Sequence, residues 1–95
     1  MNVIELINKI KEVALSQGTV NSVYDGDVYT NWNSAEVKYG SVNIGLKEIS
    51  NDGNFTTYTF VLYYGDRLQQ DKKNVNSIWT DGTNTLQSII NILNT

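Results

Sequence analysis

The fold is decided by the stretch Asn54-Phe-Thr-Thr-Tyr-Thr-Phe-Val-Leu-Tyr-Tyr-Gly-Asp-Arg67. From Phe55 to Tyr64 it consists almost entirely of aromatic, β-branched and threonine side chains, which fit the half-buried pleated surface of a β-strand. A second β-prone run, residues 42–49, precedes it, and the turn-forming cluster Ser50-Asn-Asp-Gly-Asn54 lies between the two. The two runs therefore predict a β-hairpin.

The register of this hairpin can be predicted from the faces of its strands. If Asn51-Asp52-Gly53 is a three-residue loop with Gly53 left-handed, Ser50 lies opposite Asn54. The apolar side chains then share one face. The pairs are Val42 with Leu62, Ile44 with Phe60, and Leu46 with Tyr58. A four-residue loop mixes the faces, so the three-residue loop is favoured.

The opposite side of the predicted hairpin is mostly polar. It carries Asn43, Gly45, Lys47, Thr57, Thr59, Val61 and Tyr63. This alternation predicts an antiparallel sheet with one apolar face, on which helices are expected to pack.

An N-terminal helix is predicted from Asn2 to the residues before Gly18. Asn2 is a capping residue, and Glu5 three positions later completes a capping box. Apolar residues recur at three- and four-residue steps. They are Val3, Leu6, Ile7, Ile10, Val13 and Ala14. Gly18 is expected to end the helix as a C′ glycine.

Asp25-Gly26 separates two further β-prone runs, residues 20–24 and 27–32, and predicts a second hairpin. Residues 31–34 are also compatible with a loop. An extended pattern resumes at Val37, and Gly40-Ser41 marks a bulge or a bend, because the apolar positions change from odd to even there.

A long C-terminal helix is predicted after the connector, capped by Asp71 or Asn74. Its apolar stripe steps by four and three residues. It contains Val75, Trp79, Gly82, Leu86, Ile89 and Leu93, widened by Ile78 and Ile90. The three- and four-residue spacing of the apolar residues continues unbroken through residues 80–85, although these are poor helix formers. This spacing favours one helix over two. The predicted class is α+β, in the order α-β-β-β-β-α, with both helices on one face of a small antiparallel sheet.

Composition limits the function. The 95 residues make one domain, 1–95, and the net charge of −3 argues against a nucleic-acid or anionic membrane surface. The chain contains no histidine and no cysteine, which removes the commonest general base and metal ligands and any disulfide. No apolar run is long enough to span a membrane and the start lacks a signal-peptide pattern, so a soluble protein made without a signal peptide is expected.

No motif in the sequence indicates catalysis, a metal or a cofactor. Asp25-Gly26-Asp27 has only superficial likeness to a calcium loop, because the later ligands are missing, and it is interpreted as a turn. No pair of carboxylates is placed together, and there is no glycine-rich phosphate loop. The chain is therefore expected not to be an enzyme and to have no small-molecule substrate.

Candidate contact residues remain. Asp66 and Arg67 are either a local pair at the end of a strand or a clamp at a protein interface. Lys72 and Lys73 lie where a helix dipole disfavours cations, which solvation or a partner carboxylate explains. Trp79 is expected in the core, whereas Trp32 follows a turn, where an exposed Trp is a candidate association hot spot.

Two blocks of this sequence resemble a known group of proteins. The first is Tyr58-Thr-Phe-Val-Leu-Tyr-Tyr-Gly-Asp-Arg-Leu-Gln-Gln-Asp-Lys-Lys-Asn74, followed by a helix ending Ile89-Ile-Asn-Ile-Leu93, and the second is Val23-Tyr-Asp-Gly-Asp-Val-Tyr29 after an N-terminal helix. Both resemble small virion proteins of tailed phages, including crAss-like phages, of the tail terminator and head–tail connector (neck ring) type. The resemblance implies a small antiparallel sheet flanked by helices, assembly into rings, and capping or joining of the tail tube.

The resemblance implies a structural virion protein, made in the bacterial host cytoplasm, whose partners are copies of itself and other neck or tail proteins. The alternative is a small monomeric protein-binding or inhibitor module encoded by a phage or mobile element. The connector from Gly65 to Lys73 is the favoured contact segment. The full candidate subunit interface is Trp32, Thr57, Thr59, Val61, Tyr63, Asp66, Arg67, Lys72 and Lys73.

Overall fold

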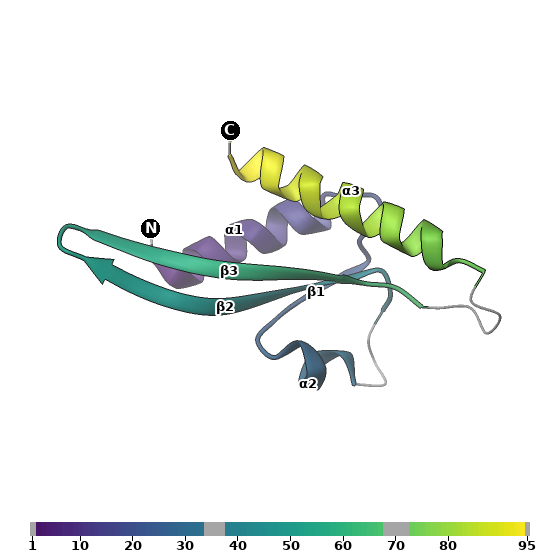
Figure 1. Cartoon of the computed structure of the whole chain (residues 1–95), viewed down its shortest axis with the longest axis horizontal. Coiled ribbons are helices and arrows are strands. Elements are labelled where there is room, and N and C mark those ends of the chain that lie inside the picture. The colour runs from purple at the N-terminus through teal and green to yellow at the C-terminus, as the bar shows by residue number, and fades with distance from the viewer. Residues whose placement is uncertain (1, 34–37, 68–72, 95) are drawn as a thin grey trace.

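The structure is a computed structural model that describes residues 2–33, 38–67 and 73–94. Its elements are α1 (Val3–Leu15), β1 (Ser22–Asp25), α2 (Val28–Trp32), β2 (Ser41–Asp52), β3 (Phe55–Gly65) and α3 (Val75–Leu93). Helices α1 and α3 lie on one side of the sheet, and the short α2 lies on the other (Figure 1). The α+β class with its N-terminal and long C-terminal helices is confirmed.

Among the described residues the sheet has three strands, in the order β1-β2-β3, and it is mixed instead of purely antiparallel as predicted. β1 runs parallel to β2, from Ser22 opposite Ser41 to Asp25 opposite Ile44, and β2 is antiparallel to β3. The prediction of a hairpin around Asp25-Gly26 is wrong, because residues 28–32 form α2 instead of a strand. Asp27 explains the difference: its side chain accepts a hydrogen bond from the backbone N–H of Tyr29 and starts a helix.

The β2–β3 hairpin forms, but its register differs from the prediction by two residues near the core. Ile44 lies opposite Leu62 and Leu46 opposite Phe60, and Asp52 opposite Phe55 leaves a two-residue loop. Because the difference is even, the predicted faces are retained. A bulge at Lys47 adds one residue to β2, and beyond it Ile49 lies opposite Tyr58. The bulge thereby brings Ile49 to the apolar side. Gly53 has the predicted left-handed backbone, with φ of 60°.

The core lies between the sheet and the two long helices. Its buried apolar residues are Ile10, Val13, Ala14, Val20, Val42, Ile44 and Ile89. The N-terminal cap is confirmed, since Oδ1 of Asn2 accepts from the N–H of Glu5 at 2.8 Å. Helix α1 ends at Leu15, three residues before Gly18, and Ser16 is its C-cap. The prediction that Gly18 ends the helix as a C′ glycine is therefore wrong.

α3 is one continuous helix, as predicted, and Gly82 lies on its buried side. Asn74 occupies the N-cap position, but its side chain donates to the carbonyl of Arg67 at 3.0 Å and does not cap the helix. Asp71, the other predicted cap, lies outside the described residues. The prediction that Trp79 is core is wrong, because its side chain is 70% exposed. At 100° per residue Trp79 points about 60° away from Gly82, onto the flank of the helix.

Candidate assembly surface

The sheet face away from α1 and α3, here called the outward face, is partly covered by α2. The chain reaches it through Gly26, whose φ of 107° is left-handed and whose N–H donates to the carbonyl of Ile44 at 3.0 Å. Asp27 then caps α2: Oδ1 accepts from the N–H of Tyr29 at 2.9 Å, and Oδ2 accepts from the hydroxyl of Thr30 at 3.3 Å. Side-chain capping therefore fixes where α2 begins.

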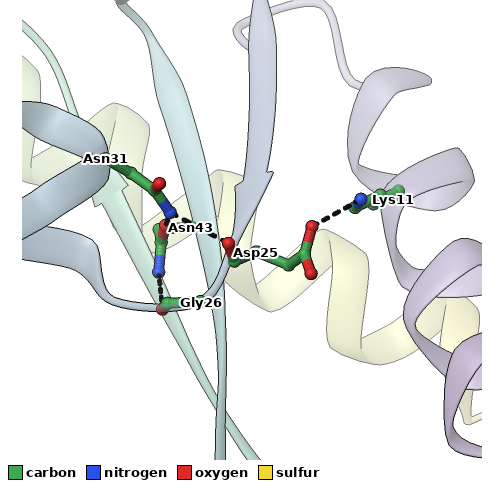
Figure 2. Close-up of polar contacts among 5 residues, drawn as sticks. All are labelled: Lys11, Asp25, Gly26, Asn31 and Asn43. Atoms are coloured by element: carbon green, nitrogen blue, oxygen red, sulfur yellow. Dashed lines mark hydrogen bonds and ion pairs between the residues drawn. The ribbon is translucent and has the colours of Figure 1, made fainter. Parts of the chain in front are cut away.

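A buried amide network holds α2 on the outward face (Figure 2). Asn43 on β2 is 0% exposed, and its Nδ2 donates to the carbonyl of Gly26 at 3.0 Å. Nδ2 of Asn31 donates to Oδ1 of Asn43 at 2.8 Å and to the carbonyl of Asp25 at 3.0 Å. The side chain of Asp25 pairs with Lys11 of α1 at 2.6 Å, on the other side of the chain. Because each buried polar atom is paired, the network fixes one position of α2.

Trp32 forms the second attachment of α2. Its Nε1 donates to Oγ of Ser41 at 3.2 Å. Its ring is perpendicular to that of Tyr63, at an interplanar angle of 82° and a centroid distance of 6.5 Å. The indole also lies against Gly65, where a Cβ atom would be 2.8 Å from the ring. An edge-to-face aromatic pair and a close glycine contact thus join α2 to the end of β3.

A groove of about 520 Å³ lies between α2 and the outward face. Tyr29 and Tyr63 flank it, and their side chains are 79% and 42% exposed. The remaining lining comes from the loop before α2 and the middle of the hairpin. It comprises Gly26, Asp27, Val28, Gly45, Leu46, Lys47 and Val61. A second hollow of about 350 Å³ shares Val28 and both tyrosines and extends to Trp32 and Asn33. The tyrosines thus offer aromatic surface beside a preformed recess.

Most residues of the predicted interface on β3 lie on this face. Thr57 and Thr59 are exposed, Val61 is half-buried, and Tyr63 lies at the groove. Trp32 is half-buried between Ser41, Tyr63 and Gly65, so its ring supports the surface and is not the freely exposed anchor that the sequence suggested. The structure therefore places Val61 and Tyr63 beside α2, and Trp32, the last residue of that helix, against Tyr63.

The charged part of the predicted interface lies beyond the end of β3. Asp66 and Arg67 are exposed, and Oδ1 of Asp66 accepts from the backbone N–H of Arg67 at 2.7 Å. The guanidinium of Arg67 lies 5.6 Å above the ring of Tyr39, within the range of a cation–π contact. Lys73 is exposed just before α3, and Lys72 lies outside the described residues. Arg67 is thus held by an aromatic ring of its own chain.

Tyr29, Asn31 and Asn43 carry or support this surface but were not predicted as contact residues. Their role depends on α2, whose residues were predicted to form a strand. One signal was available, because Asn43 is an amide between the two apolar residues Val42 and Ile44 near the start of β2, and a buried amide requires a partner. A covering segment with a second amide, such as Asn31, could have been sought on that basis.

Titratable chemistry is sparse in the part of the chain that the structure describes. No group of three or more metal-binding side chains occurs there. Burial raises the pKa of Tyr64, and the nearby carboxylates of Asp66 and Asp81 and a hydrogen bond to Asp66 raise it further. None of the helices described is both long and apolar enough to cross a membrane.

The fold and this surface define a small α+β domain with a groove beside a short covering helix. Comparison of the chain with protein-family models, with curated proteins and with solved structures finds no match.

Proposed function

We propose that this chain is a non-enzymatic assembly protein that binds other protein subunits through the surface around α2. The observation that carries the proposal is the pair of exposed tyrosines, Tyr29 and Tyr63, beside the groove of about 520 Å³. Tyrosine is enriched at the anchor positions of protein interfaces, where its ring fills a recess on the partner. The amide network of Asn31 and Asn43 holds this surface in one shape, which lowers the entropy cost of binding.

The proposed assembly is a homo-oligomeric ring at the neck or tail end of a tailed phage, of the tail terminator or connector type. The phage part rests on the resemblance of the block from Tyr58 to Asn74 to such proteins. The rim of the surface supplies charge of both signs, with Asp27 and Lys47 at the groove and Asp66 and Arg67 beyond β3. Opposite charges at a rim favour one orientation of neighbouring copies.

The ring is tested by negative-stain electron microscopy and light scattering of the purified chain. We expect closed particles, and we expect Tyr29→Ser to reduce them strongly, because it removes an exposed anchor without touching the buried network. Ile4→Ser is the matched control, since Ile4 is also an exposed apolar residue, at 62%, but lies on α1, away from this surface. A chain that remains a monomer at all concentrations contradicts the ring, as does equal assembly of the two variants.

The phage part has a separate test. Mass spectrometry of purified virions from the genome that encodes the chain should find it at the copy number of a ring component. Its absence from virions contradicts this part of the proposal. The alternative, a small monomeric module that binds or inhibits another protein, predicts a monomer whose binding is weakened by Tyr29→Ser.

A further inference from the structure

The edge of β3 is long, and β3 itself carries no charge, proline or bulge of the kind that protects an edge. β3 is the last strand in the order β1-β2-β3, so along its eleven residues it has a neighbour on one side only among the described residues. This edge is about 36 Å long at roughly 3.3 Å per residue. From Phe55 to Gly65 there is no charged residue and no proline, and the register shift of the hairpin lies on β2.

The outer part of β2 shows what a protected edge looks like in this same sheet. β1 pairs only as far as Ile44, so beyond it the second side of β2 has no strand partner among the described residues. That stretch carries the bulge at Lys47 and the charged residues Glu48 and Asp52. Bulges and charges are the devices by which natural sheets prevent edge pairing. Their presence on β2 and absence from β3 single out the β3 edge.

One flank of α3 carries two exposed apolar side chains. Trp79 and Ile90 are eleven residues apart, close to three helical turns, so they point in nearly the same direction. They are 70% and 44% exposed. A hollow of about 460 Å³ lies between β3, α3 and Ile10 of α1. It is lined by Phe60, Leu62, Leu86, Ile90 and Leu93 and also touches Val61, whose side chain belongs to the other face of the sheet. The hollow therefore reaches the backbone of the edge strand.

We propose that β3 pairs antiparallel with β3 of a second copy of this chain and so forms a continuous six-stranded sheet. All eleven residues pair when Phe60 lies opposite Phe60 of the second copy. Thr59 then lies opposite Val61, and Tyr58 lies opposite Leu62. In each pair both residue numbers are odd or both are even, so each residue lies opposite one from the same face of the sheet. No like charges meet, since β3 has none, and cross-strand aromatic and aliphatic pairs stabilise the contact.

A second copy is the occupant that these features fit. The contact is isologous, so the same edge and the same apolar α3 flank serve both chains, and each flank comes beside the other. The inference rests on the proposed function in that copies of the chain assemble, but it uses the backbone edge of β3 and not the groove at Tyr29, although Val61 and Tyr63 of β3 also line that groove. The two-fold contact joins two copies, and the outward face can join such pairs into a larger ring.

Engineered cysteines test this pairing directly, because the chain has no thiol of its own. Thr59→Cys and Val61→Cys variants are purified reduced, mixed and oxidised. Residues directly opposite on antiparallel strands have Cβ atoms about 4.5–5.5 Å apart, close enough for a disulfide after small movements. We expect a linked dimer of the two different chains by mass spectrometry. The control is a mixture of Thr57→Cys and Thr59→Cys, whose thiols lie about 13 Å out of register, and it should form several-fold less mixed dimer.

Hydrogen exchange of the unmodified chain provides a second measurement that needs no variant. Alternate amides between residues 56 and 64 should gain protection as the protein concentration rises, because the edge becomes hydrogen-bonded. Equal mixed-dimer yields in the two cysteine mixtures, or protection of these amides that does not change with concentration, overturn the pairing. If the β3 cross-links form but no closed particles are seen, the ring is contradicted and the edge pairing is not. If rings form without these cross-links, the edge pairing is contradicted and the ring is not.

Discussion

Trp32 and Gly65 are in direct contact across the outward face: a Cβ atom placed on Gly65 would lie 2.8 Å from Cη2 of the indole. A glycine at the end of β3 therefore allows α2 to pack on the sheet, and with it the surface that carries Tyr29 and the groove. The contact therefore connects Gly65, at the end of β3, with the proposed assembly function.

Gly65→Ala should displace the Trp32 ring. Overpacking of this kind costs about 1–3 kcal/mol of unfolding free energy. The emission of Trp32 should shift to the red as the indole leaves its site, measured in a Trp79→Phe background. Gly18→Ala is the matched control, because a Cβ at Gly18 meets no atom within 4 Å. If both alanine variants have wild-type emission and stability, α2 is not seated by this contact.

Asn43→Ala should detach the loop before α2. The substitution leaves Nδ2 of Asn31 without its 2.8 Å partner and the carbonyl of Gly26 without its donor. An unsatisfied buried polar group costs about 1–3 kcal/mol, so the denaturation midpoint should fall clearly. Asn76→Ala, at an exposed position of α3, should be nearly neutral. Equal midpoints for the two variants would show that the amide network contributes little.

Gly82→Ala should destabilise the chain although alanine is the better helix former. A Cβ at Gly82 would lie 2.8 Å from Cδ1 of Tyr64, so the ring or the helix must move. The overpacking cost of about 1–3 kcal/mol exceeds the gain of about 1 kcal/mol in helix propensity. Thr83→Ala, exposed on the same helix, gains propensity without the clash and should be neutral or stabilising. Thermal unfolding of both variants should therefore give shifts of opposite sign or, at the least, a loss for Gly82→Ala alone.

Stability should fall at alkaline pH through Tyr64. Its pKa is raised above the ordinary 10.0 by burial and by the carboxylates of Asp66 and Asp81, so the folded chain holds the phenolic proton more tightly than the unfolded chain. Its contribution is therefore present below pH 10.0 and is lost as the pH rises through the folded-state pKa. Urea midpoints from about pH 9 to about pH 11 should fall less steeply for Tyr64→Phe than for the exposed control Tyr29→Phe. Identical slopes would contradict this role of Tyr64.

The elements that local pattern determines were predictable from the sequence. The cap at Asn2, the helical phase through Gly82 and the two faces of the hairpin all depend on residues close in the chain. The bulge at Lys47 was harder to predict, because an inserted residue leaves little local signal. Only the odd position of Ile49, apolar where a polar side chain was due, pointed to it.

The candidate surface was predicted in part. Val61 and Tyr63 follow from the alternation along β3, and Trp32 was singled out but given the wrong exposure. The rest depends on Asp25-Gly26-Asp27, where a hairpin turn and a helix cap compete for the same residues. In the structure β1 pairs in parallel with β2, a non-local contact, and residues 28–32 form the helix that Asp27 caps. Tyr29, Asn31 and Asn43 come together only as a result of that choice.

Native mass spectrometry of the purified chain, over a dilution series, tests the assembly function most directly. The chain has a mass of 10.7 kDa. We expect one dominant closed species containing an even number of copies, because β3 pairing adds copies two at a time, and we expect Tyr29→Ser to convert it to smaller species. A mass of 10.7 kDa at every concentration would contradict the proposal that this chain acts by assembling with itself.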